Sequence, residues 1–190
     1  MRILSSITIL SVVLLAAGCA SQQKHNLPTG NKAGTPSAQD ESLSRLNQQL
    51  STDLKGDPVT ITQLNNQLKV TLANAVLFPE GGWTLSQKGE QTLARIAPTL
   101  ASLRSEQVLV ESFTDNVPIG PALRQRFPSN WELSTARATD VRRFLVARGV
   151  PKYIVSAQGS GDLRPVATND TAAGRGQNRR VEIIITSRRP

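Results

Sequence analysis

Four residues in the middle of the chain have the types and the spacing of a small binding site. Asn130, Leu133 and Arg137 stand at positions i, i+3 and i+7, so they share one face of a helix. Asp115 follows a predicted strand, and we expect its loop to lie beside that helical face. A carboxylate and a guanidinium brought together there can form a structural ion pair between loop and helix. Alternatively, they can bind the opposite charges of a ligand.

The composition argues against most enzyme chemistry. The 190 residues include one cysteine, Cys19, and one histidine, His25. These counts exclude a disulfide framework and a zinc site built from cysteines or several histidines, and they argue against a histidine-based triad. A hydrolase would need a second carboxylate, a nucleophile with a base, or a metal. We therefore expect no catalytic residue, no metal and no cofactor.

The helix that carries three of the four residues has clear ends. Ser129 and Glu132 fit a capping box, with the serine as N-cap and the glutamate at the third helical position. Gly149 and Pro151 indicate where the helix stops. The predicted core-facing residues of this helix are Ala138, Val141 and Leu145. The face that carries Arg137 lies beside this apolar stripe, and we expect it to be half-buried.

The flanking segments predict a sheet. Strands are expected at residues 59–62, 68–72, 108–113, 153–155 and 181–185, and a further helix at residues 87–103. Asn65-Asn66 predicts a hairpin turn between the first two strands, and Ser86 is a plausible N-cap for the further helix. Pro98 should kink or tighten that helix. Helices alternate with strands after an initial hairpin, which favours an α+β fold or an α/β sandwich with a mixed β-sheet.

The N-terminal residues read as a targeting segment. Residues 3–17 are almost wholly apolar or small after Arg2, which is typical of a signal peptide and short for a membrane-spanning helix. Small residues directly before Cys19 resemble a bacterial lipobox, which implies that a signal peptide of residues 1–18 is removed and Cys19 is lipid-modified. Ala20 and Ser21 follow Cys19, and the absence of aspartate directly after the cysteine resembles the signal that sorts lipoproteins to the outer membrane. The formal net charge of +8 then suits anionic envelope material rather than nucleic acid.

The segment 19–57 links this cysteine to the main domain, which we expect at residues 58–190. Residues 20–39 are rich in polar, glycine and proline residues and predict a flexible tether. A short amphipathic helix should follow, because leucines recur near helical spacing from Leu43 to Leu54. This helix can pack on the main domain, or it can bind a protein partner.

Four motifs occur in a fixed order. They are Phe113-Thr114-Asp115-Asn116, Phe127 to Ala138 (FPSNWELSTARA), Gly159-Ser160-Gly161, and Asn178-Arg179-Arg180-Val181-Glu182. Over residues 60–187 this set resembles the OmpA-like peptidoglycan-binding domain, and most of all the branch that includes the C-terminal domain of the flagellar stator protein MotB. The resemblance implies an OmpA-like α/β sandwich, with helices packed on one face of the sheet. It also implies non-catalytic binding of the diaminopimelate in the stem peptide of the cell wall.

The resemblance also assigns ligand-binding residues. They are Asp115, Arg137, Asn130, Leu133 and Asn178, and we add Thr114 and Arg179 as candidates next to them in the sequence. A free diaminopimelate end carries an ammonium and a carboxylate on one carbon, which suit Asp115 and Arg137, while Leu133 would cover the aliphatic stem. Successive residues of a strand point to opposite faces, so only one of Arg179 and Arg180 can face the site.

The chain departs from the family pattern directly before Thr114. Ser112 and Phe113 stand where the family usually has glycine followed by histidine or tyrosine.

The expected function is to tether the outer membrane to the wall, with the domain facing the periplasm. The alternative is a wall-anchoring subunit of a secretion or motor assembly.

Overall fold

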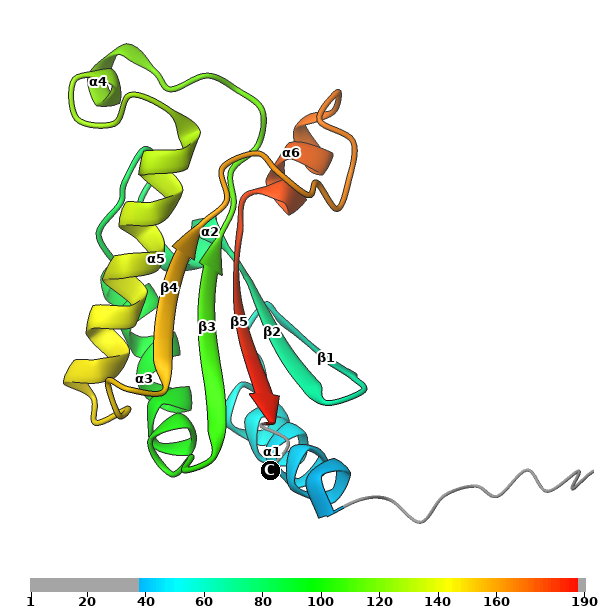
Figure 1. Cartoon of the computed structure of the whole chain (residues 1–190). Helices are drawn as coiled ribbons and strands as arrows, with labels where there is room; N and C mark the ends of the chain where they lie inside the picture. Colours follow the sequence, from blue (N-terminus) through cyan, green and yellow to red (C-terminus); the bar gives the residue numbers. More distant parts are fainter. Residues whose placement is uncertain (1–37, 188–190) are drawn as a thin grey trace, which may run out of the picture. The chain divides into compact units, whose positions relative to one another are not determined.

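The computed structural model describes residues 38–187, which lie in one compact unit (Figure 1). Its helices are α1 (Ala38–Asp53), α2 (Asn74–Leu77), α3 (Gln87–Ala101), α4 (Pro121–Arg124), α5 (Asn130–Ala147) and α6 (Ala172–Asn178). Its strands are β1 (Val59–Leu64), β2 (Gln67–Ala73), β3 (Glu106–Ser112), β4 (Val155–Gly159) and β5 (Arg180–Ser187). Among these residues, no helix is both long and apolar enough to cross a membrane.

The strands form one mixed sheet in the order β1-β2-β5-β3-β4. Only β3 and β4 run parallel; the other neighbours within the described sheet are antiparallel. The hairpin between β1 and β2 confirms the predicted turn, and Asn65 there has a φ of 50°, a left-handed conformation that asparagine tolerates. This arrangement confirms the predicted α+β fold.

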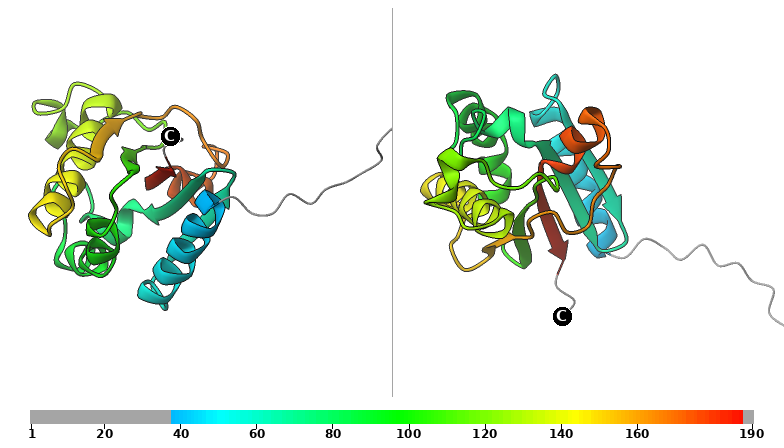
Figure 2. Two further views of the ribbon diagram at one scale, coloured as in Figure 1. Left: turned by 60° about the horizontal axis from the view of Figure 1, so that its bottom comes forward. Right: turned by 90° about the horizontal axis from the view of Figure 1, so that it is seen from above.

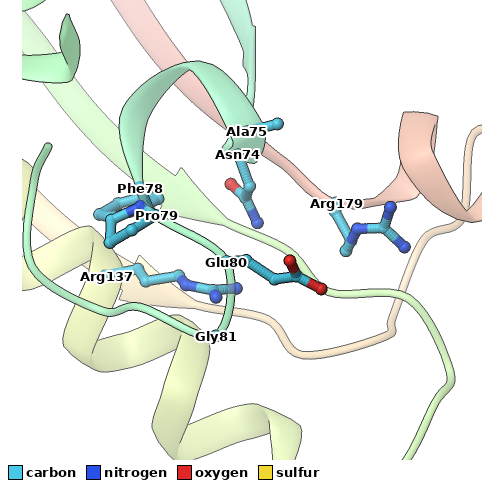
Figure 3. Close-up of a pocket in the computed structure, with 8 residues that line it drawn as sticks. All are labelled: Asn74, Ala75, Phe78, Pro79, Glu80, Gly81, Arg137 and Arg179. Atoms are coloured by element: carbon cyan, nitrogen blue, oxygen red, sulfur yellow. The ribbon is translucent and has the colours of Figure 1, made fainter.

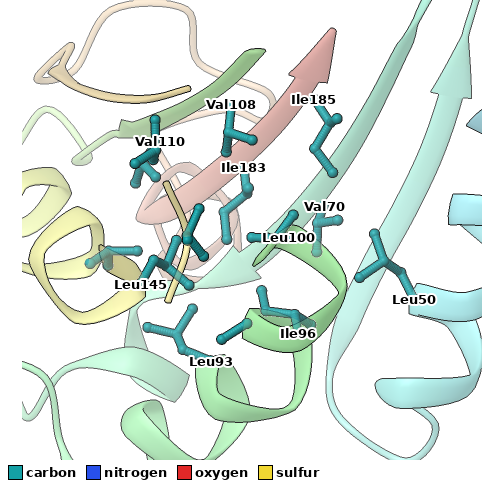
Figure 4. Close-up of a cluster of buried hydrophobic side chains, with 14 of the residues drawn as sticks. Leu50, Val70, Leu93, Ile96, Leu100, Val108, Val110, Leu145, Ile183 and Ile185 are labelled. Atoms are coloured by element: carbon teal, nitrogen blue, oxygen red, sulfur yellow. The ribbon is translucent and has the colours of Figure 1, made fainter. Parts of the chain in front are cut away.

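Three helices cover the same face of the sheet. Alternate residues of the central strands point to that face and are fully buried, among them Val70 of β2, Val110 of β3 and Ile183 of β5. They share one hydrophobic cluster with side chains from α1, α3 and α5. Figure 4 shows the apolar side chains of the sheet pointing toward those of α3 and α5, and Figure 2 shows the helices layered against the strands.

Helix α1 packs into this core. Its leucines, Leu43, Leu46 and Leu50, are at most 8% exposed, and Leu54 just after it is 4% exposed. They belong to the cluster that contains the inward residues of β2 and β5. Of the two roles considered for this helix, the structure shows packing on the main domain. The leucine stripe is therefore covered and does not offer an apolar surface to a protein partner.

Helices α3 and α5 begin as predicted. The Ser86 hydroxyl accepts a hydrogen bond from the Gly89 N–H at the start of α3. Ser129 and Glu132 form both halves of the capping box of α5. Gly149, with a φ of 95°, follows the end of α5, where the left-handed conformation favours glycine.

The predicted strand at residues 153–155 starts later than expected. Residues 152–154 form a turn, β4 begins at Val155, and Tyr153 is 69% exposed. The Ile154 N–H bonds the Pro151 carbonyl, so this backbone closes on itself instead of extending a ladder. The short helices α2, α4 and α6 have no periodic apolar pattern and were not predicted.

Candidate ligand-binding site

The candidate site lies at the end of the sheet where β3 stops and β5 starts (Figure 1). Two backbone hydrogen bonds fix the chain there. The Phe113 N–H donates to the Arg180 carbonyl at 2.9 Å, and the Thr114 N–H donates to the Gly161 carbonyl at 2.7 Å. The chain after β3 is therefore hydrogen-bonded to β5 and to the loop after β4, which places Asp115 just beyond this end of the sheet.

Asp115 is 7% exposed and is held on both carboxylate oxygens. Its Oδ1 accepts a hydrogen bond from the Val117 N–H at 3.2 Å, and its Oδ2 accepts one from Arg179 Nη1. The Thr114 hydroxyl donates to the Asp115 carbonyl at 2.8 Å. This local turn keeps the aspartate next to the first turn of α5.

Asn130, the first residue of α5, ties the Asp115 loop to that helix. Its side-chain amide donates to the carbonyls of Asp115 and Val117, at 3.2 and 3.0 Å. Leu133, one turn later, is 6% exposed and packs in a small apolar cluster with Ile119 and Phe127. Both residues thus lie on the site-facing side of α5, as the i, i+3 spacing predicted.

Arg137, one further turn along α5, is 7% exposed. Its Nε and Nη2 both donate to the Gly82 carbonyl, at 2.9 and 2.7 Å, and its guanidinium lies 5.4 Å from the centre of the Phe78 ring. Burial lowers the pKa of Arg137 to about 10; the nearby charge of Arg179 lowers it further, and that of Asp115 opposes the change. The group remains charged at neutral pH in a poorly solvated position.

The predicted partners therefore come together without pairing directly. Among residues 38–187, the salt bridge of Asp115 is with Arg179, and Arg137 forms none. The structural ion pair considered from the sequence, Asp115 with Arg137, is not formed. Arg137 is held instead by a backbone carbonyl, which leaves its positive charge uncompensated by direct contact.

A pocket of about 310 Å³ connects these groups. Six of the seven residues predicted for the site line it: Thr114, Asp115, Asn130, Leu133, Arg137 and Arg179. The guanidinium groups of Arg137, Arg175 and Arg179 and the carboxylate of Asp115 thus line one concave surface with an apolar wall. Such a surface suits a small ligand that carries a carboxylate and an aliphatic stem.

The sequence profile of the OmpA family matches residues 77–179, more than half of the chain. The chain belongs to the OmpA family. It is 34% identical over 124 residues to motility protein B of Bacillus subtilis, covering 64% of this chain and 46% of that protein. It is 33% identical over 133 residues to the probable lipoprotein YiaD of Escherichia coli, covering 70% of this chain and 58% of that protein. The chain thus spans about half the length of these relatives.

A solved structure shows the likeness in three dimensions. The cell wall anchor of the T6SS from Pseudomonas aeruginosa superposes with a TM-score of 0.68 at 37% sequence identity. The match covers 76% of this chain and 98% of that one. The resemblance inferred from the motifs, including its MotB-like character, is confirmed.

Phe113 and Ser112, which depart from the OmpA-family pattern, lie outside the pocket. Phe113 is 1% exposed, and its ring packs against the guanidinium of Arg180, 3.8 Å from the ring centre, and that of Arg164, at 5.2 Å. Ser112 is fully buried. The side chain before Thr114 therefore packs at the end of the sheet and does not line the pocket.

Asn178 is the one predicted residue that does not reach the pocket. Its Oδ1 accepts hydrogen bonds from the N–H groups of Val166 and Ala167, and its amide donates to Ala167 and Asn169. Both ends of the side chain are therefore engaged with the loop before α6. The neighbouring Arg179 faces the pocket, whereas Arg180 pairs with Glu182 on the other side, as strand alternation predicted.

Sequence reasoning missed the wall of the site that comes from the loop after α2. Gly81 lines the first pocket, and a second pocket of about 660 Å³ adjoins it (Figure 3). The lining of the second pocket consists of Asn74, Ala75, Phe78, Pro79, Glu80, Gly81, Arg137 and Arg179. No periodic pattern marks this loop; only the Gly81-Gly82 pair could have signalled a special backbone conformation.

Proposed function

We propose that this protein binds peptidoglycan without catalysis, through the diaminopimelate end of a stem peptide. The observation that carries the proposal is the pocket in which Asp115, Arg137 and Leu133 converge. The aspartate suits the ligand's ammonium, and Arg137 suits its carboxylate. Leu133 suits the aliphatic stem between the ligand's two ends. The cell wall anchor of similar structure supports this proposal.

Binding at this pocket requires an exchange of partners. Asp115 is engaged by Arg179, whose side chain is 45% exposed and can move into solvent or toward the ligand's carboxylate. Arg137 needs no such rearrangement. Its Nε and Nη2 are fixed on the Gly82 carbonyl, and its Nη1 makes no hydrogen bond with any described residue. We infer that Arg137 is the pre-positioned part of the site and Arg179 the adjustable part.

The absence of catalysis is part of this proposal. The sequence from residue 38 to 187 contains neither histidine nor cysteine. Within these residues no group of three or more His, Cys, Asp or Glu side chains could hold a metal ion. Asp115 is engaged by a guanidinium and a backbone N–H, an arrangement that suits charge recognition.

We further propose that the protein is a lipoprotein of the outer membrane whose domain faces the periplasm. The signal peptide, Cys19 and His25 lie outside the described residues, so this proposal rests on the sequence before Cys19 and on the similarity to the lipoprotein YiaD. Residues 20–37 of the predicted tether also lie outside the described residues.

The lipid anchor is tested by Cys19→Ser. The variant lacks the only thiol that can be acylated, so we expect it to leave the membrane fraction or remain unprocessed. Fractionation and intact mass measure both effects. Acyl chains contribute about 0.8 kcal/mol per buried CH₂, so an anchor with several chains should be effectively permanent. Unchanged fractionation and mass in the variant would refute lipidation at this residue.

A second candidate function is a wall-anchoring subunit of a larger envelope assembly. The similarity to motility protein B and to the T6SS cell wall anchor favours it. The same pocket would bind the wall in this case. Because the Leu43–Leu54 stripe is buried in the core, an assembly partner would have to bind another surface.

Co-sedimentation with purified peptidoglycan tests the proposed function. The full chain in detergent should pellet with the polymer, and free diaminopimelate should compete it off. The salt dependence of binding separates the pocket from charge adsorption, because exposed charges are screened above about 0.15 M salt and a partly buried site is screened less. Loss of all binding at modest salt would point to adsorption by the basic surface alone.

A further inference from the structure

Asn74 presents a buried hydrogen-bond acceptor that the fold does not use. The residue begins α2, is 5% exposed and lines the second pocket. Its side-chain nitrogen donates to the Phe113 carbonyl at 3.0 Å. A carbonyl only accepts, so this bond fixes which end of the amide faces Phe113. Its Oδ1 is buried without a hydrogen-bond partner among the described residues.

The neighbouring arginines do not donate to this oxygen. Arg137 donates through Nε and Nη2 to the Gly82 carbonyl, and Arg179 donates to Asp115. Glu80, which also lines the pocket, is an acceptor when ionised and cannot satisfy another oxygen. Figure 3 shows Asn74 on the same side of the pocket as α2, with Glu80 between the two arginines. Asn74 Oδ1 is therefore a buried acceptor in the lining of this pocket that an N–H from a ligand could satisfy.

The second pocket continues from the first. Gly81, Arg137 and Arg179 line both, so a ligand seated against Asp115 and Arg137 can extend past these shared walls to Asn74. A peptide unit matches what the second pocket offers, because it carries an N–H donor next to a carbonyl acceptor. The N–H suits Asn74 Oδ1, and the carbonyl suits a guanidinium.

We propose that the pocket around Asn74 is a second subsite, which binds a peptide amide of the wall stem adjacent to the diaminopimelate. The proposal rests on the proposed function and extends it from recognition of one amino-acid end to recognition of a peptide. Asn74 then acts as a specificity residue. A buried acceptor left unpaired disfavours a ligand that lacks the N–H, so the subsite selects diaminopimelate that is still part of a peptide.

Calorimetry with three ligands and the full chain in detergent tests the subsite. The ligands are free diaminopimelate, the tripeptide Ala-γ-Glu-diaminopimelate, and the same tripeptide with the Glu–diaminopimelate amide N-methylated. We expect the tripeptide to bind about tenfold more tightly than free diaminopimelate and N-methylation to remove that gain. Equal affinity for the tripeptide and its N-methylated form would overturn the subsite. Failure to bind any of the three would overturn the proposed function itself.

Asn74→Ala provides the test from the protein side. It removes the acceptor, so we expect the ratio of tripeptide affinity to diaminopimelate affinity to fall close to one. It also removes the bond to Phe113, and a purely structural role predicts an equal loss for both ligands with the ratio preserved, which would overturn the proposal. If Asn74→Ala does not fold, calorimetry of the three ligands with the unaltered protein tests the subsite by itself.

Discussion

Replacing Arg137 by alanine is expected to weaken peptidoglycan binding by about ten- to hundredfold while the protein stays folded. A charge-assisted hydrogen bond contributes about 1.5–3 kcal/mol, and each 1.4 kcal/mol is about tenfold in affinity. Arg137 lines both pockets and is pre-positioned by the Gly82 carbonyl. Calorimetry with diaminopimelate and co-sedimentation with peptidoglycan measure the loss.

The fold should tolerate this change because the core-facing residues of α5, Ala138, Val141 and Leu145, are untouched. Burial lowers the pKa of Arg137 to about 10, so holding the charge in place carries a desolvation cost at neutral pH. That cost persists until the pH rises through about 10, where the folded protein starts to release the proton. Because Arg137→Ala removes this desolvation cost, part of the stability lost with the packing of the arginine side chain is regained.

Arg143→Ala is the matched control. It removes the same charge from the same helix, but its side chain is 73% exposed and lies outside both pockets of the site. We expect its binding to match that of the unaltered protein. If folded Arg137→Ala binds as well as this control, and if amidation of the ligand's carboxylate also has no effect, the proposed role of Arg137 is wrong.

Asp115→Asn is expected to reduce affinity for diaminopimelate by a similar factor, about ten- to hundredfold. The substitution preserves the side-chain oxygen that accepts from Val117, so the loop should keep its shape. Among the described residues, Asp115 is the only one with a carboxylate that lines the first pocket, so the change removes the partner of the ligand's ammonium. The same calorimetric titration measures the loss, and the melting temperature reports whether the loop is disturbed.

Two comparisons make the Asp115 result interpretable. Asp162→Asn makes the same charge change at an exposed position outside the first pocket, and it should leave binding nearly unchanged. The double variant of Asp115 and Arg137 should lose less than the sum of the single losses, because the ammonium and the carboxylate that the two residues bind sit on the same ligand carbon. Strict additivity, or full binding by Asp115→Asn, would argue that the two residues do not share a ligand.

The sequence by itself predicted the parts of the fold that local rules govern. The capping box fixed the start of α5, and the i, i+3, i+7 spacing placed Asn130, Leu133 and Arg137 on one side of it. Strand alternation predicted that only one of Arg179 and Arg180 faces the site. These predictions succeed because capping, helical periodicity and strand pleat depend on residues a few positions apart.

Only the tertiary structure decided which charged groups meet. The sequence suggested Asp115 with Arg137, but the ordering of β5 next to β3 brings Arg179 to the aspartate instead. The Gly82 carbonyl reaches Arg137 across 55 positions of the chain, and the Asn74 amide reaches Phe113 across 39. No sequence pattern records such contacts, because they depend on how the sheet and helices pack. The short loop after α2 therefore became part of the site only when the fold brought it there.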